Sequence, residues 1–172
     1  MSNATPRPVR LAILTVSDSR TLADDRSGDL LVSRAGRDGH QVVERHICPD
    51  NIYAIRAVLS QWIADPNVEA IISTGGTGVT GRDGTPEAVR VLLDKEIPGF
   101  GETFRAISFG IIGTSTLQSR ALAGVANQTY IFVLPGSTSA CKDAWDHILH
   151  HQLDVRTKPC NLVELMPRLG EH

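Results

Sequence analysis

Apolar runs alternate with amphipathic stretches along this chain, and no other feature of the sequence constrains its fold as strongly. Strands are predicted for four apolar segments, residues 10–17, 40–47, 68–73 and 129–134. Helices are predicted for the stretches between and after them, residues 28–37, 52–63, 86–95, 102–110, 114–123 and 137–151. Continuous apolar strands that alternate with helices are typical of a parallel sheet buried on both faces. The sequence therefore predicts an α/β fold with a mostly parallel central sheet.

Length and composition place this sheet in a single domain. The 172 residues fit one domain, with residues 10–165 as the folded part and the polar, proline-containing residues 1–9 as a disordered arm. A net charge of -2 offers no basic stripe, so no nucleic-acid partner is expected. No apolar run approaches the roughly 20 residues of a membrane helix, so no membrane association is expected. Three widely spaced cysteines suit reduced thiols, which favours a cytoplasmic location.

A glycine-rich segment follows directly after the third predicted strand. Its residues are Thr74, Gly75, Gly76, Thr77 and Gly78. Glycines at this position let main-chain N–H groups approach an anion closely, and the threonine hydroxyls are further donors. A tight turn with positive φ is the simpler alternative for two adjacent glycines. The density of glycine and threonine favours a phosphate-binding loop.

Two well-known phosphate-binding motifs nearly fit this segment. Gly76, Gly78 and Gly81 match the spacing of the dinucleotide fingerprint, but Arg82, Asp83 and Gly84 precede the next predicted helix, which the fingerprint should open directly. The P-loop motif fails as well, because Arg82-Asp83 stands where Lys-Ser/Thr is required. The loop is therefore predicted to hold phosphate in another way, and a nucleotide-dependent oxidoreductase is disfavoured.

Polar turns follow all four predicted strands, and such strand ends meet at one edge of a parallel sheet. The turns are 17–18, Asp50, 74–78 and 135–137, which we expect to line one crevice. Asp83 lies beside the glycine-rich segment, where a carboxylate either holds Mg²⁺ or caps the following helix. Asp50 has the same two interpretations. Asp24 and Asp25 are expected to be exposed, and Thr85 is expected to cap the helix that begins at Pro86.

Seven segments of the chain resemble a known family. The segments that carry the resemblance are LAILTVSD (11–18), DDRSG (24–28), STGGTG (73–78), GRDGTPEAV (81–89), PGFGE (98–102), TSTLQSRALAGVAN (114–127) and LPGSTSA (134–140). They are similar to the MoaB/MogA family of molybdenum cofactor biosynthesis proteins, which includes the G domains of gephyrin-type proteins. The likeness extends over residues 10–162, nearly the whole chain.

The resemblance implies a single three-layer α/β/α domain that binds molybdopterin and assembles as a homo-trimer or homo-hexamer. It implies an adenylyltransferase that uses Mg²⁺ and ATP to adenylylate molybdopterin and releases pyrophosphate. Asp83 and Asp50 match the family's catalytic, magnesium-linked aspartates. The segment 74–78 would hold nucleotide phosphate or pterin. The remaining pocket residues implied by the family are Asp18, Glu102, Ser119, Arg120, Pro135, Gly136 and Ser137.

One segment departs from the MogA pattern and keeps a second function open. Residues 134–139 read LPGSTS, whereas MogA-like chains continue LPG with a proline-lysine pair. The chain therefore resembles the MoaB branch. The alternative function is a non-catalytic protein that binds molybdopterin and carries it within the same pathway.

Overall fold

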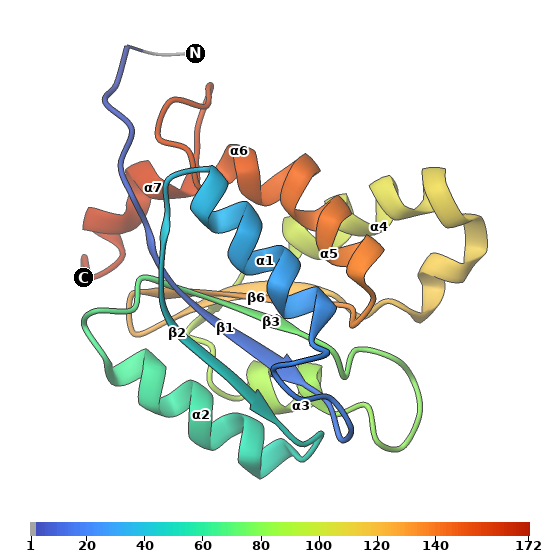
Figure 1. Cartoon of the computed structure of the whole chain (residues 1–172). Coiled ribbons are helices and arrows are strands. Elements are labelled where there is room, and N and C mark those ends of the chain that lie inside the picture. The colour runs from blue at the N-terminus through green and yellow to red at the C-terminus, as the bar shows by residue number, and fades with distance from the viewer. Residues whose placement is uncertain (1–2) are drawn as a thin grey trace.

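A six-stranded sheet forms the centre of the molecule in the computed structural model, which describes residues 3–172 (Figure 1). The strand order is β2-β1-β3-β6-β5-β4. Strands β2, β1, β3 and β6 are parallel, whereas β5 is antiparallel to both of its neighbours. The strands are β1 (Arg10–Val16), β2 (Gln41–Cys48), β3 (Ala70–Thr74), β4 (Lys95–Glu96), β5 (Leu122–Ala126) and β6 (Thr129–Leu134). The predicted mostly parallel α/β fold is confirmed.

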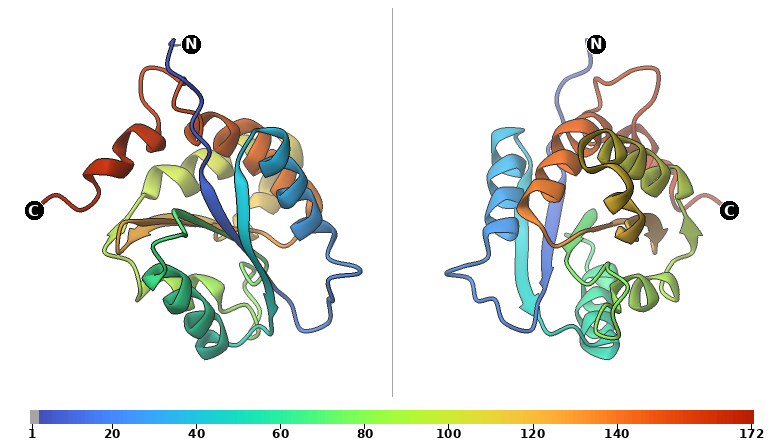
Figure 2. Two further views of the ribbon diagram at one scale, coloured as in Figure 1. Left: turned by 60° about the vertical axis from the view of Figure 1, so that its left-hand side comes forward. Right: turned by 90° about the vertical axis from the view of Figure 1, so that its right-hand side faces the viewer.

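Helices cover both faces of the sheet (Figures 1 and 2). On one face lie α1 (Arg26–Arg37), α4 (Pro98–Ile112) and α5 (Thr138–Ala144), and on the other lie α2 (Ile52–Ala64) and α3 (Thr85–Arg90). Helix α5 continues through a π-helical turn, Trp145–Leu149, into α6 (His150–Gln152), and α7 (Leu162–Leu165) lies near the C-terminus. The result is the three-layer α/β/α domain. Within residues 3–172, no helix is both long enough and apolar enough to cross a bilayer.

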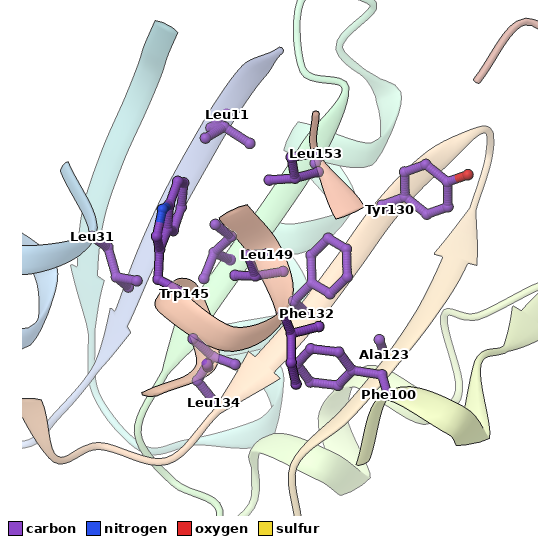
Figure 3. Close-up of a cluster of buried hydrophobic side chains, with 14 of the residues drawn as sticks. Leu11, Leu31, Phe100, Ala123, Tyr130, Phe132, Leu134, Trp145, Leu149 and Leu153 are labelled. Atoms are coloured by element: carbon purple, nitrogen blue, oxygen red, sulfur yellow. The ribbon is translucent and has the colours of Figure 1, made fainter. Parts of the chain in front are cut away.

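Two apolar clusters, one on each face of the sheet, form the core. Side chains alternate along β1, so Leu11 and Ile13 face the α1 side while Ala12 and Leu14 face the α2 side. Trp145 is fully buried on the α1 side, close to Leu31 and Leu149 (Figure 3). Burying each large apolar side chain contributes about 1.5–3 kcal/mol to folding. The core thereby fixes the strands whose ends carry the polar turns.

A β-hairpin replaces part of the helix predicted for residues 114–123. Gly113–Gln118 form a 3-10 helix, and the chain then enters β5. Strands β5 and β6 are joined by Asn127 and Gln128, whose φ angles are 46° and 67°. Positive φ at both central residues is the signature of a type I′ hairpin turn, and asparagine tolerates it better than most residues.

Other element boundaries also differ from those predicted. Helix α4 begins at Pro98, where the sequence indicated a break, because proline is well tolerated at the first helical position. Helix α3 ends at Arg90, short of the predicted 95, and residues 95–96 pair with β5 as β4 instead. Of the predicted N-terminal arm, residues 1–2 lie outside the described range. Val9 is fully buried and Arg7 forms an ion pair with Glu69.

Candidate functional site

The carboxyl ends of the parallel strands meet at one edge of the sheet, as the sequence predicted. The Asp50 N–H after β2 donates to Oδ1 of Asp18 after β1 over 3.0 Å. The Gly75 N–H after β3 donates to the carbonyl oxygen of Leu134 at the end of β6, also over 3.0 Å. The first bond joins the ends of β1 and β2, and the second joins the ends of β3 and β6. The expected single crevice is divided, because the turns after β3 and β6 line one cavity and those after β1 and β2 line another.

The glycine-rich loop is a tight turn in which two residues require glycine. Gly75 and Gly76 have φ angles of 104° and 69°. A Cβ on Gly75 would overlap the carbonyl oxygen of Val16, and one on Gly76 would overlap Oγ1 of Thr85. Positive φ and close packing therefore both exclude larger residues here. The turn also brings main-chain atoms close to the Asp50 carboxylate, since a Cβ on Gly76 would lie 2.9 Å from its Oδ2.

Two threonines of this region have other roles than those predicted. Thr74 is fully buried, and its Oγ1 donates to the Pro135 carbonyl over 2.8 Å. Its hydroxyl therefore lies behind the loop and is not a donor to a ligand. Thr85 is the first residue of α3 and does not cap it; its Oγ1 donates to the Gly75 carbonyl over 2.9 Å. Each hydroxyl satisfies a carbonyl oxygen in a partly or fully buried hydrogen bond, and leaving such an oxygen without a partner would be costly.

The Asp50 and Asp83 carboxylates lie near different glycines of the loop, Gly76 and Gly78, and their electrostatic environments differ. Burial raises the pKa of the Asp50 carboxyl above its ordinary value, and the nearby Asp83 and Asp18 charges add to the rise. The Thr80 hydroxyl, which donates to Asp83 over 2.7 Å, lowers the pKa of the Asp83 carboxyl, and the Thr80 N–H donates to it as well. Asp83 is thus held ionised, whereas Asp50 is the more easily protonated of the two.

A cavity of about 380 Å³ opens beside the loop. Its lining includes eight of the residues predicted for the site, Gly76, Thr77, Gly78, Asp83, Ser119, Pro135, Gly136 and Ser137. The opposite wall comes from α4, the 3-10 helix after it and α5, through residues that the sequence did not single out, Phe104, Ser108, Ile112, Ser115, Gln118 and Ala140. Five of these six residues fall within predicted helices, and Ile112 falls between two of those helices. The structure thus brings most of the predicted site around one cavity.

Arg120 and Glu102 lie outside this cavity. The Nε of Arg120 donates to the Gly78 carbonyl over 2.8 Å and its Nη2 to the Asp83 carbonyl over 2.9 Å. The guanidinium therefore joins the two ends of the 78–83 loop and positions Asp83. Glu102 lines a neighbouring cavity of about 450 Å³ together with Arg120, and Ser119 borders both cavities.

Asp18 is exposed and lines a different cavity, of about 420 Å³, at the ends of β1 and β2. Its carboxylate accepts a 2.6 Å hydrogen bond from Arg82, which lowers the pKa of the Asp18 carboxyl. Both side chains are exposed, so this ion pair contributes little to stability. It connects the turn after β1 to the loop that precedes α3.

Asp25 is fully buried, contrary to the expectation that it is exposed. Its carboxylate accepts hydrogen bonds from the Thr15 hydroxyl (2.7 Å), the Gly28 N–H (3.0 Å) and the Arg45 guanidinium (3.0 Å). The residue caps α1 from within the protein, whereas its neighbour Asp24 is exposed as expected. A buried carboxylate is tolerated only with such partners, and sequence pattern alone does not reveal them.

Comparison with known proteins identifies the family. A family model described as a probable molybdopterin binding domain matches residues 12–155. Molybdenum cofactor biosynthesis protein B of Escherichia coli K12 is 56% identical over 154 residues, which are 90% of this chain and 91% of that protein.

Solved structures show the same relationship. A crystal structure of molybdenum cofactor biosynthesis protein B superimposes with a TM-score of 0.88 at 36% identity, covering 98% of this chain and 100% of that one. MoaB of Thermus thermophilus, described as a molybdopterin biosynthesis enzyme, has a TM-score of 0.74 at 33% identity, and the match covers 82% of this chain and 89% of that one.

Fold and site together define an α/β domain with a glycine-lined crevice at the carboxyl edge of its sheet. More particularly, the chain belongs to the molybdopterin-binding-domain family of molybdenum cofactor biosynthesis proteins, as the sequence resemblance implied.

Proposed function

We propose that the protein binds molybdopterin and catalyses its Mg-ATP-dependent adenylylation. The observation that carries this proposal is that the Asp50 and Asp83 carboxylates both lie against a glycine loop that borders a 380 Å³ cavity, which Asp83 lines and Asp50 does not. A Cβ on Gly78 would lie 2.5 Å from Oδ2 of Asp83, so that carboxylate is as close to the loop as Asp50 is. The proposal that the ligand is a pterin rests on the family model, which describes a probable molybdopterin binding domain.

The proposed reaction needs positioning more than covalent chemistry. The terminal phosphate of molybdopterin attacks the α-phosphorus of ATP, a P–O bond forms, and the bond to the β-phosphate breaks to release pyrophosphate. Such transfers depend on in-line placement and on neutralising the phosphate charge. The main-chain N–H groups around residues 76–78 and 136–137 would hold phosphate, while the apolar wall that includes Phe104 and Ile112 would face the ring systems.

The carboxylates of Asp50 and Asp83 are suitable ligands for a magnesium ion that is also held by substrate phosphates. Among residues 3–172, no group of three or more His, Cys, Asp or Glu side chains could hold a metal ion. Mg²⁺ usually retains waters and is bound through one or two carboxylates together with substrate phosphates. Asp83, which is kept ionised, and Asp50 would supply those carboxylates. The bound ion would neutralise phosphate charge.

A non-catalytic molybdopterin-binding or carrier protein is the second candidate function. Of the described side chains that line the cavity, only Asp83 is charged, so no lysine or arginine there would offset phosphate charge. A site that only holds the pterin needs less of this neutralisation than one that transfers a nucleotide. The LPGSTS segment points to the same alternative, because it has no lysine where MogA-like chains have one.

Assembly and location belong to the same proposal. The family resemblance favours a homo-trimer or homo-hexamer that acts in the cytoplasm. Sedimentation velocity of the purified protein tests the assembly, and a purely monomeric protein would contradict it.

Incubation of the purified protein with molybdopterin and Mg-ATP separates the two functions. Adenylylated molybdopterin and an equal amount of pyrophosphate are expected. Retained molybdopterin with no product above background would favour the carrier. Failure to bind molybdopterin would contradict both candidates, and micromolar binding of NAD(P)H would instead favour an oxidoreductase.

A further inference from the structure

A buried hydroxyl from α1 holds the loop that follows β6. Ser27 lies in the first turn of α1, is 1% exposed, and its Oγ donates to the Gly136 carbonyl over 2.8 Å. The adjacent Asp25 cap anchors this turn, because its carboxylate accepts the Gly28 N–H. Helices α1 and α5 lie side by side in the views, which places the start of α1 against the loop that opens α5 (Figures 1 and 2).

The preceding carbonyl of the same loop is held in the same way. Oγ1 of Thr74 donates to the Pro135 carbonyl over 2.8 Å and lies 3.1 Å from Sγ of Cys141. Burial raises the pKa of the Cys141 thiol to about 11, so this cysteine is a packing partner and not a nucleophile. Two consecutive carbonyl groups are therefore directed toward buried hydroxyls at the rear of the loop.

Because the peptide group is planar, the direction of these two carbonyl groups also fixes the direction of the two N–H groups that follow them. In a planar trans peptide the C=O and the following N–H point in opposite directions. The N–H groups of Gly136 and Ser137 therefore point away from Thr74 and Ser27, and the same two residues line the cavity. Within residues 3–172, neither N–H donates to a protein acceptor.

The simpler alternative is that Ser27 only satisfies a partly buried carbonyl oxygen. The hydrogen bond from Ser27 also affects a second loop, because Gly136 is packed closely against Gly75. A Cβ on Gly136 would lie 3.3 Å from the Cα of Gly75. The two loops that border the cavity are thus in contact, and a rotation of the Gly136 peptide would disturb both. The hydroxyl fixes an orientation on which a ligand contact depends.

We propose that Ser27 is a positioning residue of the cavity, whose hydroxyl directs the Ser137 N–H at an anionic group of the ligand. Thr74 does the same for the Gly136 N–H. The inference rests on the proposed function in so far as the anionic group is a phosphate. It adds a residue, Ser27, that has no contact with the ligand and still sets its affinity.

The test follows main-chain N–H resonances of the ¹⁵N-labelled full-length protein during titration with inorganic pyrophosphate. In the unmodified protein, the Gly136 and Ser137 signals are expected to shift with saturation. Ser27→Ala should weaken pyrophosphate binding about five- to tenfold, the effect of losing one well-directed hydrogen bond to a charged group. Ser27→Thr, which retains the hydroxyl, should restore most of the affinity. Ser33→Ala, an exposed serine on the same helix, is the matched control and should bind as the unmodified protein does.

Three outcomes would overturn the inference. The first is that the Gly136 and Ser137 resonances of the unmodified protein do not respond to pyrophosphate. The second is that folded Ser27→Ala binds pyrophosphate with unchanged affinity. The third is that Ser27→Thr weakens pyrophosphate binding as much as Ser27→Ala does. Failure of the inference and failure of the proposed function can be told apart. A pyrophosphate response without molybdopterin binding would remove the function and leave the inference, and the reverse pattern would remove the inference alone.

Discussion

The Gly84 N–H donates to Oδ1 of Asp50 over 3.2 Å, and this bond joins the end of β2 to the loop that carries Asp83. The hydrogen bond holds Asp50 in a partly buried position near a second carboxylate. Burial and like charge both disfavour its ionised form. Such an arrangement costs stability, and proteins retain that kind of cost at functional sites.

Asp50→Asn is therefore expected to raise the melting temperature at pH 7. Because the folded-state pKa of Asp50 is raised, its ionised form destabilises the protein above that pKa, and the cost disappears as the pH falls through it. The gain over the unmodified protein should thus shrink on acidification. Calorimetry at pH 7 and pH 4 measures both values. A lower melting temperature for Asp50→Asn at pH 7 would contradict this account.

Asp83→Asn should have the opposite effect on stability. The pKa of Asp83 is lowered in the folded state, so its charge stabilises the protein above the ordinary aspartate pKa, and the contribution is lost as the pH falls through the folded value. The variant should melt at a lower temperature at pH 7, and the two proteins should converge in acid. An unchanged difference between pH 7 and pH 2.5 would show that the carboxylate charge is not the cause.

The ion pair between the buried Asp25 and the partly exposed Arg45 gives a prediction with an internal control. Asp25→Ala leaves the guanidinium and the Thr15 hydroxyl without their buried partner, so we expect a loss of about 3 kcal/mol or more. Asp29 pairs with the same arginine at 2.8 Å, but its side chain is 58% exposed. Asp29→Ala should therefore remain within about 1 kcal/mol of the unmodified protein. Urea unfolding measures both, and equal losses would contradict the assignment.

Strand ends and the glycine loop were predictable because they depend on local pattern. Continuous apolar runs indicate buried strands, and parallel topology then brings the carboxyl ends of those strands to one edge of the sheet. The order of the outer strands was not predictable in this way. Strand β5 is short and contains Gly124, and its turn has Asn127 without the glycine that usually marks a type I′ hairpin.

The buried polar contacts could not be predicted from the sequence, for a different reason. Asp25 resembles any surface aspartate until Thr15 and Arg45, from two different strands, are placed around it. Ser27 and Thr74 likewise acquire their roles only through carbonyl groups 109 and 61 positions away in the sequence. Such contacts arise from the tertiary fold and leave no local periodicity. The 102–110 segment, in contrast, was recognised as a helix, but the cavity-facing position of Phe104 was not.

Gly76→Ala tests whether the loop conformation is required for ligand binding. Alanine at a φ of 69° is strained, and its Cβ would overlap Thr85 Oγ1, so a destabilisation of about 2 kcal/mol is expected. Molybdopterin affinity should fall at least about tenfold, since a shift of the loop misdirects its N–H groups. Gly81→Ala, with no atom within 4 Å of the added Cβ, is the control. Equal affinity in the two variants, measured by fluorescence titration, would contradict a binding role for the loop.

The rate of molybdopterin adenylylation by Asp83→Asn is the most direct test of the central claim. The claim is that the crevice at residues 74–83 is a magnesium-assisted site for pterin and nucleotide. With saturating molybdopterin and Mg-ATP, the unmodified protein and the control Asp29→Asn should form product at the same rate. Asp83→Asn should lose at least about a hundredfold while it still binds molybdopterin and keeps its assembly state. Activity of Asp83→Asn equal to that of the control would contradict the account.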